Sequence, residues 1–261
     1  ILRHLPARRQ TLFFSATMPN PIITLTRDML RDPVTINLAR RAAPAVGITQ
    51  AAYPVPQELK ATLFLALLER GEIREALVFT RTKHRADRLA KHLVRHGIEA
   101  ERIHGNRSQP QRTQALAGFK SGKYRVLVAT DIAARGIDIE ALGHVVNFDV
   151  PKVPEDYIHR VGRTARMEAV GDAFTFVAPD EEEDLRRIER ALGKRLPRVI
   201  VPDFGYTAKA ETRLEVPLGE RIAAIRAKKA EDRARSAAKA TARPTHRAPE
   251  HGRSGPRRRG R

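Results

Sequence analysis

The sequence predicts an α/β protein, with a parallel sheet and helices on both of its faces, across about residues 50–204. Apolar strand-like segments alternate along this stretch with longer segments of helical pattern. The most apolar of them, residues 125–130 (RVLVAT), is rich in β-branched residues and suits a strand buried on both faces. The 261 residues, 41% of them hydrophobic, are enough for one or two domains with their own cores.

The first 38 residues are predicted to be the end of a preceding α/β domain. Residues 9–19 (RQTLFFSATMP) indicate a strand that ends in a hydroxyl-rich turn, followed by a helix to Leu30 and the extended segment 32–38. Residues 39–49, which include Pro44, are expected to form a linker. Because the chain begins with Ile, and its first six residues resemble the end of a helix, we expect a fragment of a longer polypeptide.

Five strands and four helices are predicted within residues 50–204. The strands are expected at residues 75–80, 101–105, 125–130, 144–150 and 172–179. The helices are expected at residues 83–96, 109–119, 157–166 and 181–192.

Polar residues follow most of these strands, where open parallel sheets bind their ligands. They are Thr80, Arg81 and Thr82, then Asn106 and residues 109–112 (QPQR), then Asp131 and Asp138. Residue types alone favour structural roles over ligand binding. Aspartates often cap helices or form turns, and Gln109 and Arg112 suit an ordinary helix surface.

Residues 157–166 (YIHRVGRTAR) place Arg160, Arg163 and Arg166 three residues apart, behind His159. On one short helix this spacing puts the three arginines on one face, so that their charge can point at a single polyanion such as a phosphate chain. The alternative is a solvated basic helix face.

The net charge of +19 is unevenly distributed. Residues 221–261 carry 14 Lys and Arg against 3 Asp and Glu, a net charge of +11 in 41 residues. We therefore expect residues 205–261 to be a disordered basic tail that binds nucleic acid without sequence selectivity, or that only confers solubility. There is no cysteine, so a disulfide framework is not expected. There is no apolar run of about 18 residues, so a membrane partner is not expected either. We expect a cytoplasmic location.

Three other patterns are rejected as sites. Residues 118–124 (GFKSGKY) have three residues between the glycines, where a phosphate loop needs four. His92 and His96 lie one helical turn apart without an evident third ligand, so a surface helix is favoured over a metal site. The acidic run in residues 174–184 is favoured as the first turn of a helix.

Five segments, in this order and spacing, resemble the C-terminal half of a DEAD-box RNA helicase, and most of all its RhlE-like bacterial branch. They are residues 15–17 (SAT), 78–82 (VFTRT), 109–112 (QPQR), 129–138 (ATDIAARGID) and 159–166 (HRVGRTAR). One departure is Ala165, where the family usually has Gly before its last arginine. The resemblance covers about residues 1–200 and implies a RecA-like fold for the predicted sheet, preceded by a remnant of another RecA-like domain.

The resemblance also implies roles for individual residues. Arg163 and Arg166 would be arginine fingers at the ATP γ-phosphate, and Asp138 would bind the ribose of the nucleotide. Ser15, Thr17, His159 and Arg160 would couple the nucleotide site to RNA and to the other domain. The RNA groove would be lined by residues that contact phosphates and 2′-hydroxyls, namely Arg81, Thr82, Gly105, Gln109, Arg112 and Thr130.

The function implied is that of an ATP-dependent RNA helicase which unwinds or remodels short RNA duplexes. ATP and Mg²⁺ would be held mainly by a first domain absent from this chain, so the fragment alone is expected to be inactive. Sequence-nonspecific RNA is the expected partner, together with ribosomal or RNA-degradation assemblies, and no metal ligand is expected on this chain. Two alternatives stay open: a non-catalytic RNA-binding or annealing module, and a DNA-directed helicase of superfamily 2.

Overall fold

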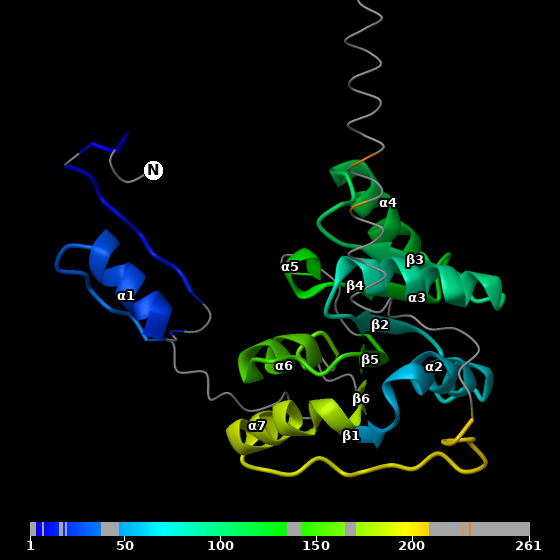
Figure 1. Cartoon of the computed structure of the whole chain (residues 1–261). Coiled ribbons are helices and arrows are strands. Elements are labelled where there is room, and N and C mark those ends of the chain that lie inside the picture. The colour runs from blue at the N-terminus through cyan, green and yellow to red at the C-terminus, as the bar shows by residue number, and fades with distance from the viewer. Residues whose placement is uncertain are drawn as a thin grey trace, which may run out of the picture. The chain divides into compact units, whose positions relative to one another are not determined.

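A six-stranded sheet, all of whose pairings are parallel, forms the centre of the domain (Figure 1). The computed structural model describes residues 4–6, 8–15, 18, 20–37, 47–134, 142–164, 171–208, 226 and 230. The strands are β1 (Ile48–Pro54), β2 (Ala76–Phe79), β3 (Ala100–Ile103), β4 (Val126–Ala129), β5 (His144–Asn147) and β6 (Gly171–Val177). Their order in the sheet is β1-β6-β5-β2-β4-β3, which confirms the predicted α/β class.

Helices cover both faces of this sheet. In chain order they are η2 (Gln57–Leu59), α2 (Lys60–Glu69), α3 (Lys83–Arg95), α4 (Gln109–Lys120), α5 (Asp131–Ala134), α6 (Pro154–Val161), η3 (Pro179–Glu181) and α7 (Glu182–Leu192). Side chains of β2 show the two faces, because Val78 packs in one cluster with residues of α2 and α3, whereas Leu77 and Phe79 pack in another with residues of α4 and α5. A third cluster joins β6 to α6 and α7, which lie side by side (Figure 1).

The sequence pattern does not indicate β1 or α2, and their composition explains this. β1 (ITQAAYP) has only two β-branched residues and ends at a proline, so it lacks the usual strand signature. α2 (KATLFLALLE) is buried on most sides, and its nearly continuous apolar run hides the helical period. The predicted helix at residues 157–166 is too long at its C-terminal end, because α6 ends at Val161.

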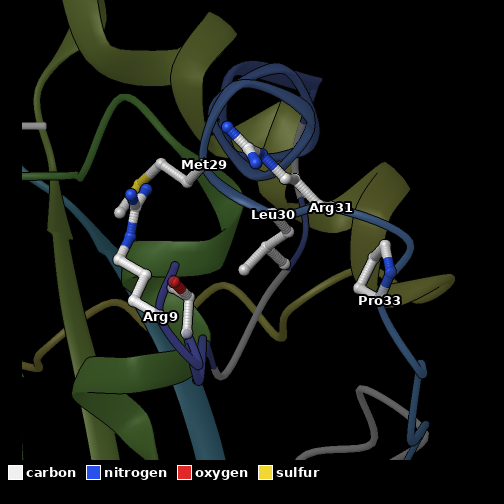
Figure 2. Close-up of a pocket in the computed structure, with 6 residues that line it drawn as sticks. Arg9, Met29, Leu30, Arg31 and Pro33 are labelled. Carbon is white, nitrogen blue, oxygen red and sulfur yellow. The ribbon is translucent and has the colours of Figure 1, made fainter. Parts of the chain in front are cut away.

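Among the described residues up to position 37, the only α-helix is α1 (Asn20–Met29), as the sequence predicts. Residues 9–15 form no strand, because a strand needs a neighbour for its ladder and the described residues supply none. A small pocket lies between this segment and the end of α1 (Figure 2). It is lined by Arg9, Thr11, Met29, Leu30, Arg31 and Pro33.

The domain limits at residues 38, 49 and 204 stay predictions. The expected basic tail lies outside the described residues, except for 205–208, 226 and 230. None of the described helices has the length and apolar character needed to cross a bilayer. Within the described ranges, no three His, Cys, Asp or Glu side chains are grouped as a metal site would require.

Candidate functional site

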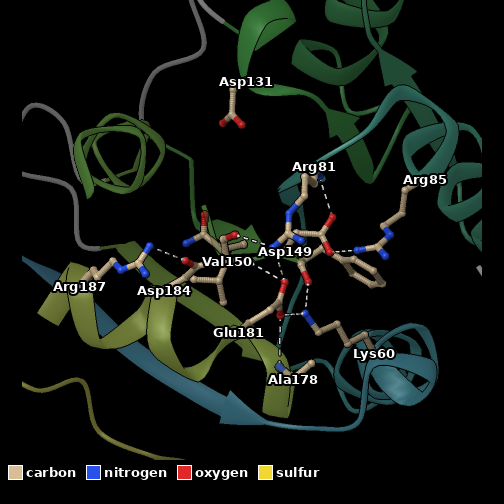
Figure 3. A network of polar contacts seen from close by, with 12 residues as sticks. Lys60, Arg81, Arg85, Asp131, Asp149, Val150, Ala178, Glu181, Asp184 and Arg187 are labelled. Carbon is tan, nitrogen blue, oxygen red and sulfur yellow. Dashed lines mark hydrogen bonds and ion pairs between the residues drawn. The ribbon is translucent and has the colours of Figure 1, made fainter. Parts of the chain in front are cut away.

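Buried charged side chains meet at the carboxyl ends of β2, β5 and β6 (Figure 3). At their centre is Glu181, the last residue of η3, whose side chain is 2% exposed. One carboxylate oxygen accepts from Arg81 Nη2 at 3.0 Å and from the backbone N–H of Val150 at 3.3 Å. The other accepts from Lys60 Nζ and from the backbone N–H of Ala178 at 3.2 Å. A single carboxylate therefore joins the ends of β2, β5 and β6 to the start of α2.

Lys60 is the buried cation of this network, with no exposed side-chain surface. Its ammonium group donates to Glu181 and, at 2.9 Å, to the carbonyl of Phe148. Burial lowers the pKa of Lys60, and the neighbouring carboxylates of Glu181 and Asp149 oppose this shift without cancelling it. A buried charge without a partner is strongly destabilising, so removing either Lys60 or Glu181 would destabilise the fold by leaving the other charge unpaired.

Asp149 extends the network toward the middle of the sheet. Its carboxylate is fully buried and accepts from the backbone N–H of Arg81 at 2.7 Å and from the guanidinium of Arg85. Its carbonyl accepts from Arg160 Nη1 at 2.8 Å. Asp149 therefore links the loop after β2, which carries Arg81, to helix α6, which carries Arg160.

Arg160 points into the domain and not toward a ligand. Its guanidinium is 3% exposed and forms a two-pronged pair with Asp131, from Nε to Oδ1 at 2.6 Å and from Nη2 to Oδ2 at 2.8 Å. Nη1 also donates to Asn147 Oδ1 at 3.2 Å, and the group lies 5.1 Å from the ring centre of Phe79. Every nitrogen of the guanidinium has a partner inside the domain.

The prediction that three arginines share one helix face is therefore wrong. Arg163 lies in the turn after α6, where its backbone N–H donates to the carbonyl of Arg160 at 3.1 Å. Gly162 has already left the helix, so the three-residue spacing no longer fixes a common face. Arg166, like Ala165, lies outside the described residues. His159 is exposed on α6.

The turn of Arg163 is held in place by its neighbour Thr164. Thr164 is buried, its hydroxyl donates to the carbonyl of Leu142, and the two residues form a parallel β-bridge. Asp138 lies outside the described residues, yet it is only four positions before Leu142 in the chain. The bridge thus joins the turn of Arg163 to Leu142, which lies two residues before β5.

The other predicted residues follow β2, β3 and β4, three strands at one side of the sheet. Thr82 caps helix α3, because its hydroxyl oxygen accepts from the backbone N–H of Arg85 at 3.2 Å. Gly105 comes two residues after β3 and is exposed, and Thr130 directly follows β4 and is half-buried. The order β2-β4-β3 therefore places Thr82, Thr130 and Gly105 along one edge.

Gln109 and Arg112 stand on the first turn of α4 and contact each other. Arg112 Nη1 donates to Gln109 Oε1 at 3.2 Å, and Nη2 donates to the carbonyl of Ala133 in α5 at 3.1 Å. Arg112 therefore tethers α5, the helix after β4, to the helix after β3. This pairing leaves the amide nitrogen of Gln109, an exposed residue, for a ligand.

Of the residues expected to couple two domains, Ser15 is described and exposed, and Thr17 lies outside the described residues. Sequence reasoning missed Lys60, Asp149 and Glu181, the centre of the network. A signal was available for two of them, since Lys60 opens a largely apolar helix and Asp149 is a charged residue within the predicted strand 144–150. The acidic residues 182–184 do occupy the first turn of α7, as predicted, but Glu181 precedes that helix.

Comparisons with known proteins agree with this architecture. Residues 59–168 match the family described as helicase conserved C-terminal domain. The chain is 41% identical over 216 residues to the DEAD-box ATP-dependent RNA helicase CshA of Geobacillus kaustophilus, covering 83% of this chain and 46% of that protein. The chain thus spans about half the length of the curated relatives it matches.

Two solved structures are also similar. The crystal structure of the Escherichia coli DEAD-box protein SrmB bound to regulator of ribonuclease activity A has a TM-score of 0.57 and 33% identity, covering 64% of this chain and 98% of that one. Saccharomyces cerevisiae Dbp5, solved bound to RNA and ADP BeF3, has a TM-score of 0.65 and 29% identity, covering 76% of this chain and 53% of that one. The assignment to the RhlE-like branch stays a prediction.

Proposed function

Because this chain belongs to the DEAD-box family of ATP-dependent RNA helicases and carries their conserved C-terminal domain, we propose that it is the C-terminal half of an enzyme that couples ATP hydrolysis to remodelling of short RNA duplexes. A first domain would bind most of the ATP and Mg²⁺. This chain would close over the nucleotide and supply part of the RNA groove, and by itself it would not hydrolyse ATP. We keep a cytoplasmic location and ribosomal or RNA-degradation partners as parts of the same proposal.

The observation that carries the proposal is that the residues proposed to bind RNA lie along one edge of the sheet. Arg81 and Thr82 follow β2, Thr130 follows β4, and Gly105 follows β3, which are consecutive strands. Because the oxygen of Thr82 accepts from the backbone of α3, its O–H group remains to donate to a phosphate oxygen. The edge thus offers hydroxyl, amide and guanidinium donors, which suit the phosphates and 2′-hydroxyls of RNA better than its bases.

On the nucleotide side, we propose that Arg163 and Arg166 approach the γ-phosphate and that Asp138 binds the ribose. An arginine lowers the barrier to phosphoryl transfer by stabilising charge on the transferring group, provided that it is held in position. The contact of Thr164 with Leu142 supports this role for Arg163, because it fixes the turn in which Arg163 lies. Arg160 would serve the site indirectly, by fixing α6 through Asp131, and we assign Ser15, Thr17 and His159 to contacts between the domains.

The proposed substrate class is tested by ATP hydrolysis in the full-length enzyme. We expect single-stranded RNA to stimulate turnover strongly, and DNA of the same length and sequence to stimulate it weakly, because DNA lacks the 2′-hydroxyl groups that the groove would bind. The measurement is steady-state ATPase activity against nucleic-acid concentration. Equal or greater stimulation by DNA would reject an RNA-directed enzyme.

Gly105 tests the groove with little disturbance of the fold. A Cβ atom at this position would meet nothing within 4 Å, and the backbone does not adopt a positive φ. Gly105→Ala should therefore leave the melting temperature unchanged. If RNA passes close to this backbone, the added methyl group should weaken RNA binding at least about fivefold, equivalent to about 1 kcal/mol.

Gly143 provides a matched control for this substitution. A Cβ atom there also meets nothing within 4 Å, but Gly143 directly precedes β5 and therefore lies at the amino end of the strands. Gly143→Ala should leave RNA affinity unchanged in the same fluorescence anisotropy titration. Equal affinities for the two variants would argue against a groove at Gly105.

A further inference from the structure

Glu181 has no part in the proposed ATP hydrolysis or in direct RNA binding, yet it contacts Arg81, one of the residues proposed to bind RNA. Its carboxylate accepts from Arg81 Nη2 at 3.0 Å, and the carbonyl of Val150 accepts from the same nitrogen at 3.2 Å. Both N–H bonds of this nitrogen are thus directed into the domain. The position of the guanidinium is therefore set by a buried group.

The rest of the Arg81 guanidinium remains available to a ligand. Its side chain is 38% exposed, and its Nε and Nη1 atoms have no hydrogen-bond partner within the described part of the chain. A long arginine side chain loses about 2 kcal/mol of conformational freedom when it is fixed. If the domain has already fixed it, a phosphate group need not do so, and binding is tighter.

Lys60 decides whether Glu181 helps or hinders such binding. A carboxylate close to a phosphate site would by itself repel the phosphate. Here Lys60 pairs with the other oxygen of Glu181 from the buried side, and it has no exposed surface of its own. The charge of Glu181 is thus balanced from within, while its contact with Arg81 keeps the direction of the guanidinium.

We infer that Glu181 is a positioning residue for RNA, which holds the Arg81 guanidinium so that its free donors meet an RNA phosphate. This inference rests on the proposed RNA groove and adds a residue to it that does not itself touch RNA. It predicts that the effects of Glu181 and Arg81 on RNA affinity are not independent.

The test compares five variants of the full 261-residue chain with the wild type: Arg81→Ala, Glu181→Gln, the double variant of these two, Lys60→Met, and Lys60→Met combined with Arg81→Ala. A glutamine offers one acceptor oxygen to the four donors that surround Glu181, and the buried Lys60 ammonium competes for it, so Arg81 loses its partner. Affinity for a 12-nucleotide single-stranded RNA is measured by fluorescence anisotropy at several salt concentrations. Melting temperatures are measured in parallel.

We expect Arg81→Ala and Glu181→Gln each to weaken RNA binding about tenfold, as loss of one charged hydrogen-bonding contact would. The double variant should bind no more weakly than either single variant. Arg81→Ala, Glu181→Gln and their double variant should each also reduce the slope of log affinity against log salt by about 0.7, which corresponds to one phosphate contact on a single strand. Any contribution of the basic tail is the same in all variants and cancels in these comparisons.

Lys60→Met separates positioning from a loss of stability. It breaks the same buried ion pair from the other side and should lower the melting temperature at least as much as Glu181→Gln does. Since Glu181 can still hold Arg81, a further Arg81→Ala change in this background should again weaken RNA binding about tenfold. If Lys60→Met instead removes the contribution of Arg81, the network acts only through stability and the inference is wrong.

The remaining outcomes separate this inference from the proposed function. If Arg81→Ala weakens binding but Glu181→Gln does not, or if their effects simply add, the groove stands and the positioning role is rejected. Tighter binding by Glu181→Gln would show that the carboxylate competes with RNA, which also rejects the inference. If Arg81→Ala itself has no effect, the assignment of Arg81 to the RNA groove fails first.

Discussion

Replacement of Arg163 by alanine in the full-length enzyme is expected to reduce ATP hydrolysis by about 10³-fold or more while much of the ATP binding is kept. An arginine at the γ-phosphate interacts more strongly with the charge that develops in the transition state than with bound ATP. A first domain would supply most of the contacts to bound ATP, so the substitution should slow hydrolysis more than it weakens ATP binding. The measurement is the single-turnover rate of hydrolysis, together with the affinity for a fluorescent ATP analogue.

The fold of the Arg163→Ala variant should be intact, because Arg163 lies in a turn after α6 and is only half-buried. Arg186→Ala, which changes an exposed arginine on α7, is the matched control and should hydrolyse ATP at the wild-type rate. Wild-type turnover in Arg163→Ala would refute its role as an arginine finger. A large fall in melting temperature would instead show that Arg163 supports the fold.

The sequence predicts the sheet because buried parallel strands carry a strong signal. The segments around Val78, Val128 and Val146 are apolar on both faces and bounded by polar residues, as strands between two helical layers must be. The same burial defeats prediction for α2, where a helix surrounded by other elements loses its polar face.

For the site, the sequence predicts which residue types gather at the carboxyl ends of the strands but not which of them face outward. Thr82, Gly105 and Thr130 lie at one edge because strand order brings together the ends of β2, β4 and β3. The direction of a long side chain depends on partners distant in the chain. Arg81 meets Glu181 across 100 residues, and Arg160 meets Asp131 across 29, so periodicity along the chain carries no information on either contact.

The same limit explains the error about the arginines. Three-residue spacing predicts a common face only while the helix continues, and here it ends at Val161. Arg160 remains on the inner side of α6, next to two buried polar residues, Asn147 and Asp149, that need donors. Arg163 falls in the following turn. We therefore expect the two arginines of this motif to have different roles: Arg160 stabilises the fold, and Arg163 contacts the nucleotide.

Replacement of Arg160 by methionine tests this division. Methionine has a comparable length but no donors, so the buried oxygens of Asn147 and Asp149 and the carboxylate of Asp131 lose their partner. Removing one member of a buried ion pair costs about 3–5 kcal/mol, which for a domain of this size lowers the melting temperature by about 10 °C or more. Thermal unfolding followed by circular dichroism measures this directly.

The partner residue supplies the control for this prediction. Asp131 is the partly exposed member of the pair, with 28% of its side chain accessible, so Asp131→Asn should destabilise the chain less than Arg160→Met does. Once Arg160 is methionine, the additional Asp131→Asn change should cost little, because the carboxylate has already lost its partner. A solvent-facing Arg160 that bound a polyanion would give the opposite pattern, in which Arg160→Met unfolds at the wild-type temperature and only ligand affinity falls. Arg163→Ala is expected to unfold at the wild-type temperature and to lose ATP hydrolysis while it keeps much of its ATP binding. Measuring thermal unfolding and ATP hydrolysis for both variants therefore decides which arginine belongs to the fold and which to the nucleotide site.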